Sequence, residues 1–202
     1  DTLATLQERE YRAGLAEVVK YGAIGDRDFF EWLEENAKVV QARDPAALDH
    51  VIARSVANKA EIVIADERES GLRALLNFGH SFGHALEAET EYRTFLHGEA
   101  VAIGMVVASR LSESRALCPT GTTDRLATLL TRLGLPVSIP AETSTDGLCA
   151  ALNLDKKAVA QGLRLILLKS IGEAVIDDNS SWQQTLDAMA RSRAATVATD
   201  RE

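Results

Sequence analysis

The chain has 202 residues, of which 46% are apolar and 26% are charged, a composition typical of one globular domain or a compact pair. The formal net charge is −8 and the lysines and arginines form no cluster, which argues against nucleic acid as a partner. No apolar run is long enough to cross a bilayer, and the N-terminus has no secretory signal. We therefore expect a cytoplasmic protein without a membrane partner. Cys118 and Cys149 fit no CxxC pattern, so we expect two free thiols.

The first half of the chain shows helical periodicity. A helix is expected over residues 6–22, and Asp26 can cap a second helix containing Phe29, Phe30, Trp32 and Leu33. Asp44 followed by Pro45 is a start signal for a helix to about Ala65. Gly71 precedes a predicted long helix, residues 72–90, and another is expected from His97 to about Ala116. The apolar stretches 75–76 and 100–107 indicate that these last two helices are central.

The second half begins with a break at residues 119–123. A helix is expected near 124–134, and a short one from Ser144-Thr145 to about Leu152. The period then changes to that of two strands, 162–168 and 173–176, around a turn at 170–172. A last helix is expected near 181–192, with residues 191–202 as a tail that frays. The sequence therefore predicts one mainly α domain over 1–202, built of several helices and a small β-hairpin.

A polar stripe runs along the predicted helix 72–90. His80 and His84 are four residues apart, so at ~100° per residue they share a face, and Arg73 and Asn77 extend that face. A buried polar stripe is costly unless a ligand or another group pairs with it. Gly79 and Gly83 on the same helix indicate that something approaches its backbone closely.

His97 adds a third histidine to this set. Zinc accepts imidazole and carboxylate ligands, and a catalytic zinc site usually has three protein ligands and one open position. Spacing alone favours His80, His84 and His97, but a carboxylate can come instead from Glu17, Glu87 or Glu99. The residue pattern does not choose among these sets, and core histidines that bind only their neighbours are the alternative without a metal.

Three lysine-containing segments have ordinary interpretations as well. Glu17 and Lys20 lie one turn apart, as in a surface salt bridge, although the apolar residues around them indicate burial. Lys59 fits a solvated helix position. The segment Asp155-Lys156-Lys157 fits a plain turn before the strands.

Several motifs in order carry a family resemblance. The segments are 14–22 (GLAEVVKYG), 77–84 (NFGHSFGH) and 96–105 (LHGEAVAIGM), with Lys59 and Asp66-Glu67, Gly71-Leu72-Arg73, Asp155-Lys156-Lys157 and Ile171-Gly172 between and after them. Over about residues 1–176 the chain resembles the C-terminal, metal-binding domain of 3-dehydroquinate synthases, which belong to the sugar phosphate cyclases.

The resemblance implies a specific assignment of the site. The metal ligands match Glu17, His80 and His97, whereas His84 matches a residue that contacts substrate. The implied substrate-binding positions are Lys20, Lys59, Arg73, Asn77 and His84, with one of Lys156 and Lys157. The implied metal is zinc or cobalt.

The resemblance also implies the reaction, in which 3-deoxy-D-arabino-heptulosonate 7-phosphate becomes 3-dehydroquinate and phosphate with NAD as a transient oxidant. These 202 residues contain no glycine-rich dinucleotide-binding loop, so we expect the N-terminal NAD-binding domain to be absent and the isolated chain to be inactive. The full-length enzyme is expected to be a homodimer of the shikimate pathway. The alternatives are another sugar phosphate cyclase, a polyol dehydrogenase-like domain, and a non-catalytic helical interaction module.

Overall fold

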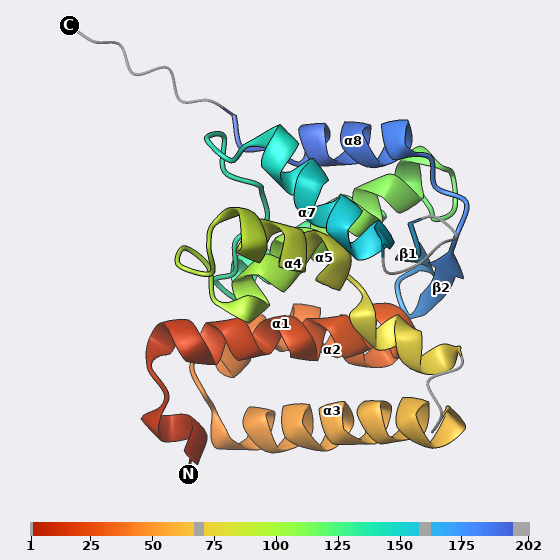
Figure 1. Ribbon diagram of the computed structural model, residues 1–202. Helices are drawn as coiled ribbons and strands as arrows, with labels where there is room; N and C mark the ends of the chain where they lie inside the picture. The colour runs from red at the N-terminus through yellow and green to blue at the C-terminus, as the bar shows by residue number, and fades with distance from the viewer. Residues whose placement is uncertain (1, 67–70, 158–162, 196–202) are drawn as a thin grey trace, which may run out of the picture.

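A computed structural model describes residues 2–66, 71–157 and 163–195. The described part is mostly helical with one antiparallel hairpin (Figure 1), which confirms the predicted fold class. The elements are η1 (Thr2–Thr5), α1 (Glu8–Gly25), α2 (Arg27–Gln41), α3 (Pro45–Ala65), η2 (Leu72–Asn77), α4 (His80–Glu89), α5 (His97–Ser114), α6 (Thr122–Arg132), α7 (Thr145–Lys157), β1 (Leu165–Ser170), β2 (Glu173–Asp177) and α8 (Trp182–Arg191). Here η denotes a 3₁₀ helix.

Helix α5 lies at the centre of the fold. Thirteen of its residues are buried, among them Ala100 to Ser109 without a break, because the helix contacts α1, α4, α6, α8 and β1 on its different sides. A helix that is apolar all round is stable only when it is covered in this way. The prediction that the stretch 100–107 belongs to a central helix is confirmed.

The predicted helix over residues 72–90 is wrong, because the chain breaks at Phe78 and Gly79. The first part is the 3₁₀ helix η2, and α4 begins only at His80. Gly79 has φ +81°, a conformation that side chains disfavour, and a Cβ there would lie 2.6 Å from Cγ of Met105. The polar stripe is therefore made by two elements, and Leu75 and Leu76 are half-buried at its edge rather than central.

Glycines set the distances between α5 and its neighbours α4 and α1. A Cβ on Gly83 would lie 3.1 Å from Cα of Val101, and one on Gly104 would collide with the carbonyl oxygen of Gly79. One on Gly98 would collide with the carbonyl oxygen of Ala13 in α1. The close approach that the glycines predicted is thus made by helix α5, and it brings the start of α5 beside the middle of α1.

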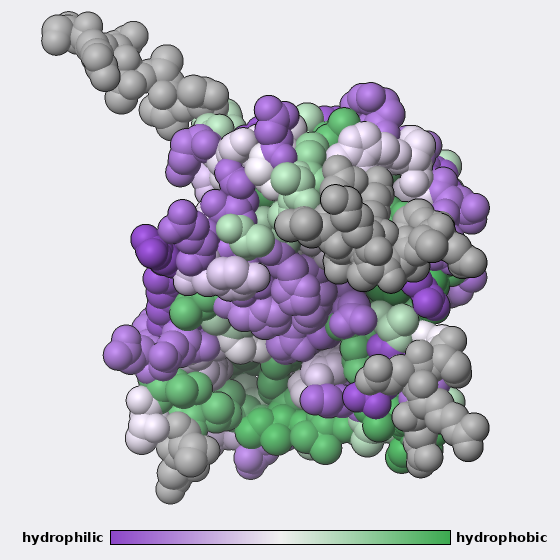
Figure 2. Space-filling view, viewed as in Figure 1, coloured by the Kyte–Doolittle hydropathy of each residue, from purple (hydrophilic) through white to green (hydrophobic). Residues whose placement is uncertain are grey.

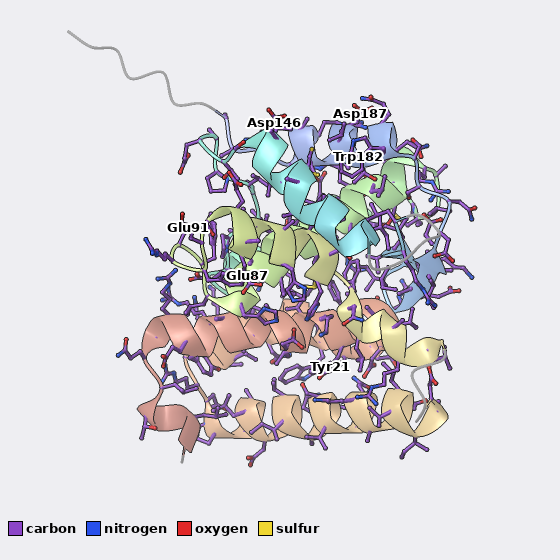
Figure 3. The ribbon with its side chains drawn as sticks, in the orientation of Figure 1. Tyr21, Glu87, Glu91, Asp146, Trp182 and Asp187 are labelled. Carbon is purple, nitrogen blue, oxygen red and sulfur yellow. The ribbon has the colours of Figure 1, made fainter. Side chains whose placement is uncertain are left out.

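Helices α1, α2 and α3 form the lower layer in Figure 1. Asp26 caps α2 by accepting a hydrogen bond from the backbone N–H of Phe29 at 3.1 Å. Asp44 caps α3 by accepting one from the backbone N–H of Ala47 at 3.0 Å. Both caps were predicted from the sequence. Tyr21 points from α1 towards α3 (Figure 3). Helix α3 exposes the apolar residues Ile52, Val56 and Ile64, and Figure 2 shows apolar surface along this helix.

The hairpin is anchored to α1 by its turn. In the antiparallel register Leu165 pairs with Asp177 and Leu167 with Val175, with an irregularity between Leu168 and Ser170. Gly172 has φ +86°, and its N–H donates to the carbonyl oxygen of Ala23 in α1 at 2.9 Å. The strands lie within three residues of where alternation placed them.

Of the remaining helices, α6 and α8 pack against α5, and α7 packs against α4. Helix α7 continues to Lys157, so Asp155-Lys156-Lys157 belongs to a helix and not to a turn. After α8, Arg193 forms a parallel bridge with Ile139, within the segment expected to fray; residues 196–202 lie outside the described part. Both cysteines are free, as predicted. Within the described residues, no helix combines the length and apolar character needed to cross a membrane.

Candidate metal and substrate site

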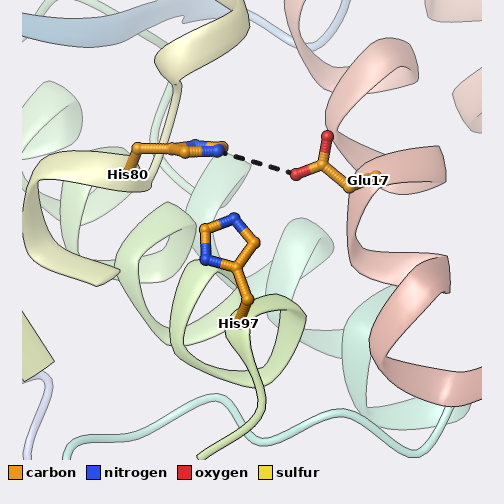
Figure 4. Close-up of side chains that lie close together, drawn as sticks. All are labelled: Glu17, His80 and His97. Carbon is orange, nitrogen blue, oxygen red and sulfur yellow. Dashed lines mark ion pairs between the residues drawn. The ribbon is translucent and has the colours of Figure 1, made fainter. Parts of the chain in front are cut away.

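Glu17, His80 and His97 converge from three different helices (Figure 4). Glu17 lies in α1, His80 is the first residue of α4 and His97 the first of α5. One ligand atom from each lies within 4.8 Å of the other two. The sequence separates these residues widely, and the glycine contacts of α5 with α1 and α4 bring them together.

His80 is held with one ring nitrogen towards Glu17. Its Nδ1 lies 3.2 Å from the carbonyl oxygen of Phe78, which can only accept, so Nδ1 carries the proton. Nε2 lies 3.8 Å from Oε1 of Glu17. Burial, and then the charge of Lys20, lower the pKa of His80 to about 4. The ring is therefore neutral near pH 7, with the Nε2 lone pair facing the site.

His97 is oriented by a buried carboxylate. Its Nδ1 lies 3.3 Å from both carboxylate oxygens of Glu87, and Glu87 is only 7% exposed. The label of Glu87 lies beside α4 and α5 in Figure 3, and its contact is with the first residue of α5. The other ring nitrogen of His97 points between His80 and Glu17 (Figure 4). A carboxylate behind a histidine is a common arrangement in metal sites, where it fixes the ring orientation.

Glu17 supplies the strongest sign that a cation fits here. Its Oε2 accepts from Nζ of Lys20 at 2.6 Å, but its Oε1 is buried and has no hydrogen-bond partner in the described structure. A buried carboxylate oxygen without a partner is costly. Two imidazoles and one carboxylate form a donor set that catalytic zinc sites use, so the residues present fit a divalent cation.

Lys20 is an unusual neighbour for such a set, because it is only 3% exposed. Burial lowers its pKa, and the carboxylate of Glu17 counteracts this in part. The pair is thus a buried contact beside the site and not a surface salt bridge.

The other carboxylates have different surroundings. Glu99 accepts a hydrogen bond from Arg9 at 2.7 Å and one from the backbone N–H of Leu96 at 2.8 Å, so it caps the N-terminus of α5.

The three imidazole rings form a triangle with centroids 5.2–5.6 Å apart. Among the described residues, however, no ligand group within 4.8 Å contains all three histidines, and the second group found is His84, Glu87 and His97. That second group uses a carboxylate already turned towards His97.

Two hollows lie beside these ligands and share Ala74 and Asn77. The Lys59 hollow has a volume of about 350 Å³ and is lined by Lys59, Arg73, Ala74, Leu76 and Asn77. The His84 hollow has a volume of about 240 Å³ and is lined by Ala74, Asn77, His80, Ser81, His84, Arg164 and Ile166. A larger hollow near Pro136 and Pro140 contains none of the predicted site residues. Figure 2 shows hydrophilic side chains gathered between α4 and α1.

These hollows bring together most of the predicted substrate-binding residues. Asn77 and His84 face the same hollow, although they belong to different elements. Lys59 from α3 joins Arg73 from η2, and the backbone N–H groups of Gly71 and Arg73 donate to the buried carboxylate of Asp66. The structure places Lys156 and Lys157 in α7, but their side chains lie outside the described part.

Sequence reasoning missed two contributions to the site. It weighed Glu87 only as a ligand, although Glu87 contacts His97 from behind, and it gave no role to Arg164. Glu87 is buried and charged, which no periodicity reveals. Arg164 belongs to a segment that the sequence interpreted only as a strand.

Comparison with known proteins identifies the family. Residues 14–158 match the family model of the 3-dehydroquinate synthase C-terminal domain. The chain is 53% identical to a 3-dehydroquinate synthase of Nitrosococcus oceani, over 88% of the chain and 50% of that protein. The chain thus spans about half the length of the curated relatives it matches.

Two solved structures extend the comparison to other enzymes. The first is ValA, a 2-epi-5-epi-valiolone synthase from Streptomyces hygroscopicus subsp. jinggangensis 5008 with NAD⁺ and Zn²⁺ bound; the TM-score is 0.81 at 33% identity, over 94% of this chain and 52% of that one. The second is a 2-deoxy-scyllo-inosose synthase with carbaglucose-6-phosphate, NAD⁺ and Co²⁺. The TM-score is 0.74 at 26% identity, over 91% of this chain and 50% of that one. Because the family model matches more than half of the chain, the chain belongs to the family of 3-dehydroquinate synthase C-terminal domains.

Proposed function

We propose that the chain is the metal- and substrate-binding part of a 3-dehydroquinate synthase. The enzyme would convert 3-deoxy-D-arabino-heptulosonate 7-phosphate to 3-dehydroquinate and phosphate, in the cytoplasm, as a step towards the aromatic amino acids. The observation that carries the proposal is the unpartnered Oε1 of Glu17 facing His80 and His97, beside a hollow lined by Lys59 and Arg73. A cation site next to paired positive charges suits a polyhydroxylated, anionic substrate.

In this proposal Glu17, His80 and His97 hold a zinc or cobalt ion. The donor set supports this choice over the second group, because Oε1 of Glu17 lacks a partner while Glu87 faces His97. A divalent ion, when bound, supplies Lewis acidity to hydroxyl groups of the substrate. The chain's own residues set the orientation: Phe78 and Glu87 fix the two imidazoles, and Lys20 holds the second oxygen of Glu17.

The substrate would be held by residues of the two hollows. Arg73 presents a planar fork that suits a carboxylate, and Lys59 adds a second charge beside it. Asn77 and His84 provide further hydrogen-bonding groups on the other side of Ala74. We keep Lys156 and Lys157 as alternatives for one further contact, since both lie at the end of α7. Orientation and charge stabilisation are the main contributions that such residues make.

We propose that NAD is bound by residues outside these 202. Two observations support this proposal. These 202 residues contain no glycine-rich dinucleotide-binding loop, and the matching part makes up about half the length of the relative. When bound, NAD would supply a reversible hydride acceptor for a substrate carbon. The isolated chain would then hold metal and substrate groups but would not turn substrate over.

A different sugar phosphate cyclase is the alternative. The likeness to ValA at 33% identity favours it, since related cyclases share this fold. The pairing of Lys59 with Arg73 in one hollow favours a substrate that carries a carboxylate, which the heptulosonate does.

The test is phosphate release from the heptulosonate phosphate, with Zn²⁺ or Co²⁺ and NAD. The 202-residue chain is assayed alone and with the N-terminal half of a close relative supplied in trans. We expect no turnover alone and metal-dependent turnover when the halves combine. Turnover with hexose phosphates but not with the heptulosonate would favour the alternative cyclase, and turnover by the chain alone would contradict the division of roles.

We further propose that the full-length enzyme is a homodimer. The support is the apolar outer side of α3, where Ile52, Val56 and Ile64 are 45%, 63% and 75% exposed. Light scattering on the full-length enzyme tests this, and a monomer at micromolar concentration would contradict it.

A further inference from the structure

Arg164 lies at the start of the hairpin, across the His84 hollow from α4. It directly precedes β1, between Leu163 and Leu165, which are 8% and 1% exposed. Because successive side chains alternate along an extended chain, the two buried leucines turn Arg164 outwards. Leu165 pairs with Asp177, so the backbone beside Arg164 is held by the hairpin.

The hairpin forms one wall of the His84 hollow. Arg164 and Ile166 line it from that side, while Asn77, His80 and His84 line it from η2 and α4. Arg164 is exposed, and it makes no hydrogen bond or ion pair with any other residue of the part that the structure describes. It is also the one described residue of this hollow whose charge is permanent, because the guanidinium does not lose its proton in proteins.

Each of the two hollows is thus lined by at least one positively charged side chain. Arg73 and Lys59 lie in one, and Arg164 lies in the other, with Asn77 and Ala74 between them. The proposed substrate has two anionic groups at opposite ends of its carbon chain, a carboxylate and a phosphate. A guanidinium fork binds two phosphate oxygens at once, and the amide of Asn77 cannot supply that charge.

The geometry points to Arg164 as a residue that binds the phosphate group of the substrate in the His84 hollow, opposite the carboxylate end held by Arg73. This inference rests on the function proposed above and adds a positioning contact to it. The same contact retains the phosphate ion after it leaves.

The experiment separates the two ends of the substrate. The metal-loaded chain is titrated with inorganic phosphate, followed by ³¹P NMR, and with quinate, a hydroxylated cyclic carboxylate without phosphate. Arg164→Gln weakens phosphate binding by about tenfold or more, the loss expected for a charge-assisted pair, and leaves quinate affinity unchanged. Arg73→Gln does the reverse. Arg164→Lys keeps the charge without the fork and recovers part of the phosphate affinity.

Arg132→Gln is the matched control. Arg132 is exposed in the last turn of α6 and lines neither hollow, so its loss changes the net charge equally and leaves both affinities unchanged. Circular dichroism and metal content verify the fold of each variant, and Arg164→Lys decides the question if the glutamine variant unfolds. Unchanged phosphate affinity in a folded Arg164 variant overturns the inference, as does a wild-type chain that binds no phosphate. If both probes behave as expected but the combined halves do not turn over the heptulosonate phosphate, the proposed function fails while the phosphate contact stands.

Discussion

Nδ1 of His97 lies equally far, 3.3 Å, from the two carboxylate oxygens of Glu87. A carboxylate only accepts, so Nδ1 of His97 donates in this contact and Nε2 is turned towards the site. Phe78 does the same for His80 through its carbonyl oxygen. Two histidines that begin two helices are therefore both oriented with Nε2 towards the site.

Glu87→Gln is expected to weaken zinc binding about 10- to 100-fold, the usual effect of losing a carboxylate behind a metal-binding histidine. The amide can place its NH₂ group against Nδ1 and so favour the other tautomer. Competition with a fluorescent chelator measures the affinity. Glu91→Gln is the control, since Glu91 is exposed and its carboxylate forms an ion pair with exposed Arg93. Equal zinc affinity in Glu87→Gln and wild type would contradict the role given to Glu87.

The ligand set itself is tested by metal content. Glu17→Gln, His80→Ala and His97→Ala are expected to purify with little zinc or cobalt, because each removes one of three donors. His84→Ala should retain the metal. Elemental analysis after dialysis gives the answer. If His84→Ala loses metal as completely as His80→Ala while Glu17→Gln retains it, the ion is held by the group of His84, Glu87 and His97 instead.

The sequence predicted the helices well where their signals are local. Asp26 and Asp44 were identified as caps because a capping carboxylate lies directly before its helix, and the hairpin followed from a change of period. The break at Gly79 was missed, since apolar spacing continues through it. Gly79 has φ +81° and packs closely against Met105, and neither feature changes the apolar spacing of the sequence.

The site was predictable in part for the same reason. His80 and His84 share a helix, so spacing brought them together, but spacing also favoured a triad with His97 that the described structure does not form. The approach of Glu17 depends on how closely α1 packs against Gly98, which is a contact distant in sequence. The resemblance to a family supplied that information, whereas residue patterns left three carboxylates open.

Asp26 makes the stability of the fold depend on pH. Burial raises the pKa of Asp26, but hydrogen bonds from Asn58, the N–H of Phe29 and Arg54 together outweigh it, so the pKa lies below its usual value. A lowered folded-state pKa means that the stabilisation is present at neutral pH and is lost as the pH falls through that pKa.

Asp26→Asn is therefore expected to lower the free energy of unfolding at pH 7 by about 1–2 kcal/mol, because asparagine still caps the helix but loses the charged contact. Urea unfolding at several pH values measures this. The difference between variant and wild type should shrink below about pH 4, where the unfolded aspartate is protonated. Asp28→Asn serves as the control, since Asp28 is exposed. A difference that stays constant down to pH 2 would show that the charge of Asp26 contributes nothing.

Gly104→Ala tests whether close helix packing builds the site. The added methyl group would collide with the carbonyl oxygen of Gly79 and lie 2.8 Å from the backbone nitrogen of Gly83. Backbone atoms cannot move aside as a side chain can, so α4 must shift away from α5. Overpacking of this kind typically costs about 1–3 kcal/mol. Since His80 begins α4 and His97 begins α5, the same shift should also weaken zinc binding.

Gly14→Ala provides the matched comparison. Gly14 lies inside α1 and is exposed, and within the described part of the chain no atom beyond its own stretch of helix lies within 4 Å of the position a Cβ would take. Alanine there should raise the free energy of unfolding by up to about 1 kcal/mol through helix propensity, with zinc affinity unchanged. Urea unfolding and chelator competition on both variants give the two readouts. Suppose that Gly104→Ala matches Gly14→Ala in both free energy of unfolding and zinc affinity. Helices α4 and α5 then tolerate a wider spacing, and the position of His80 does not depend on their contact.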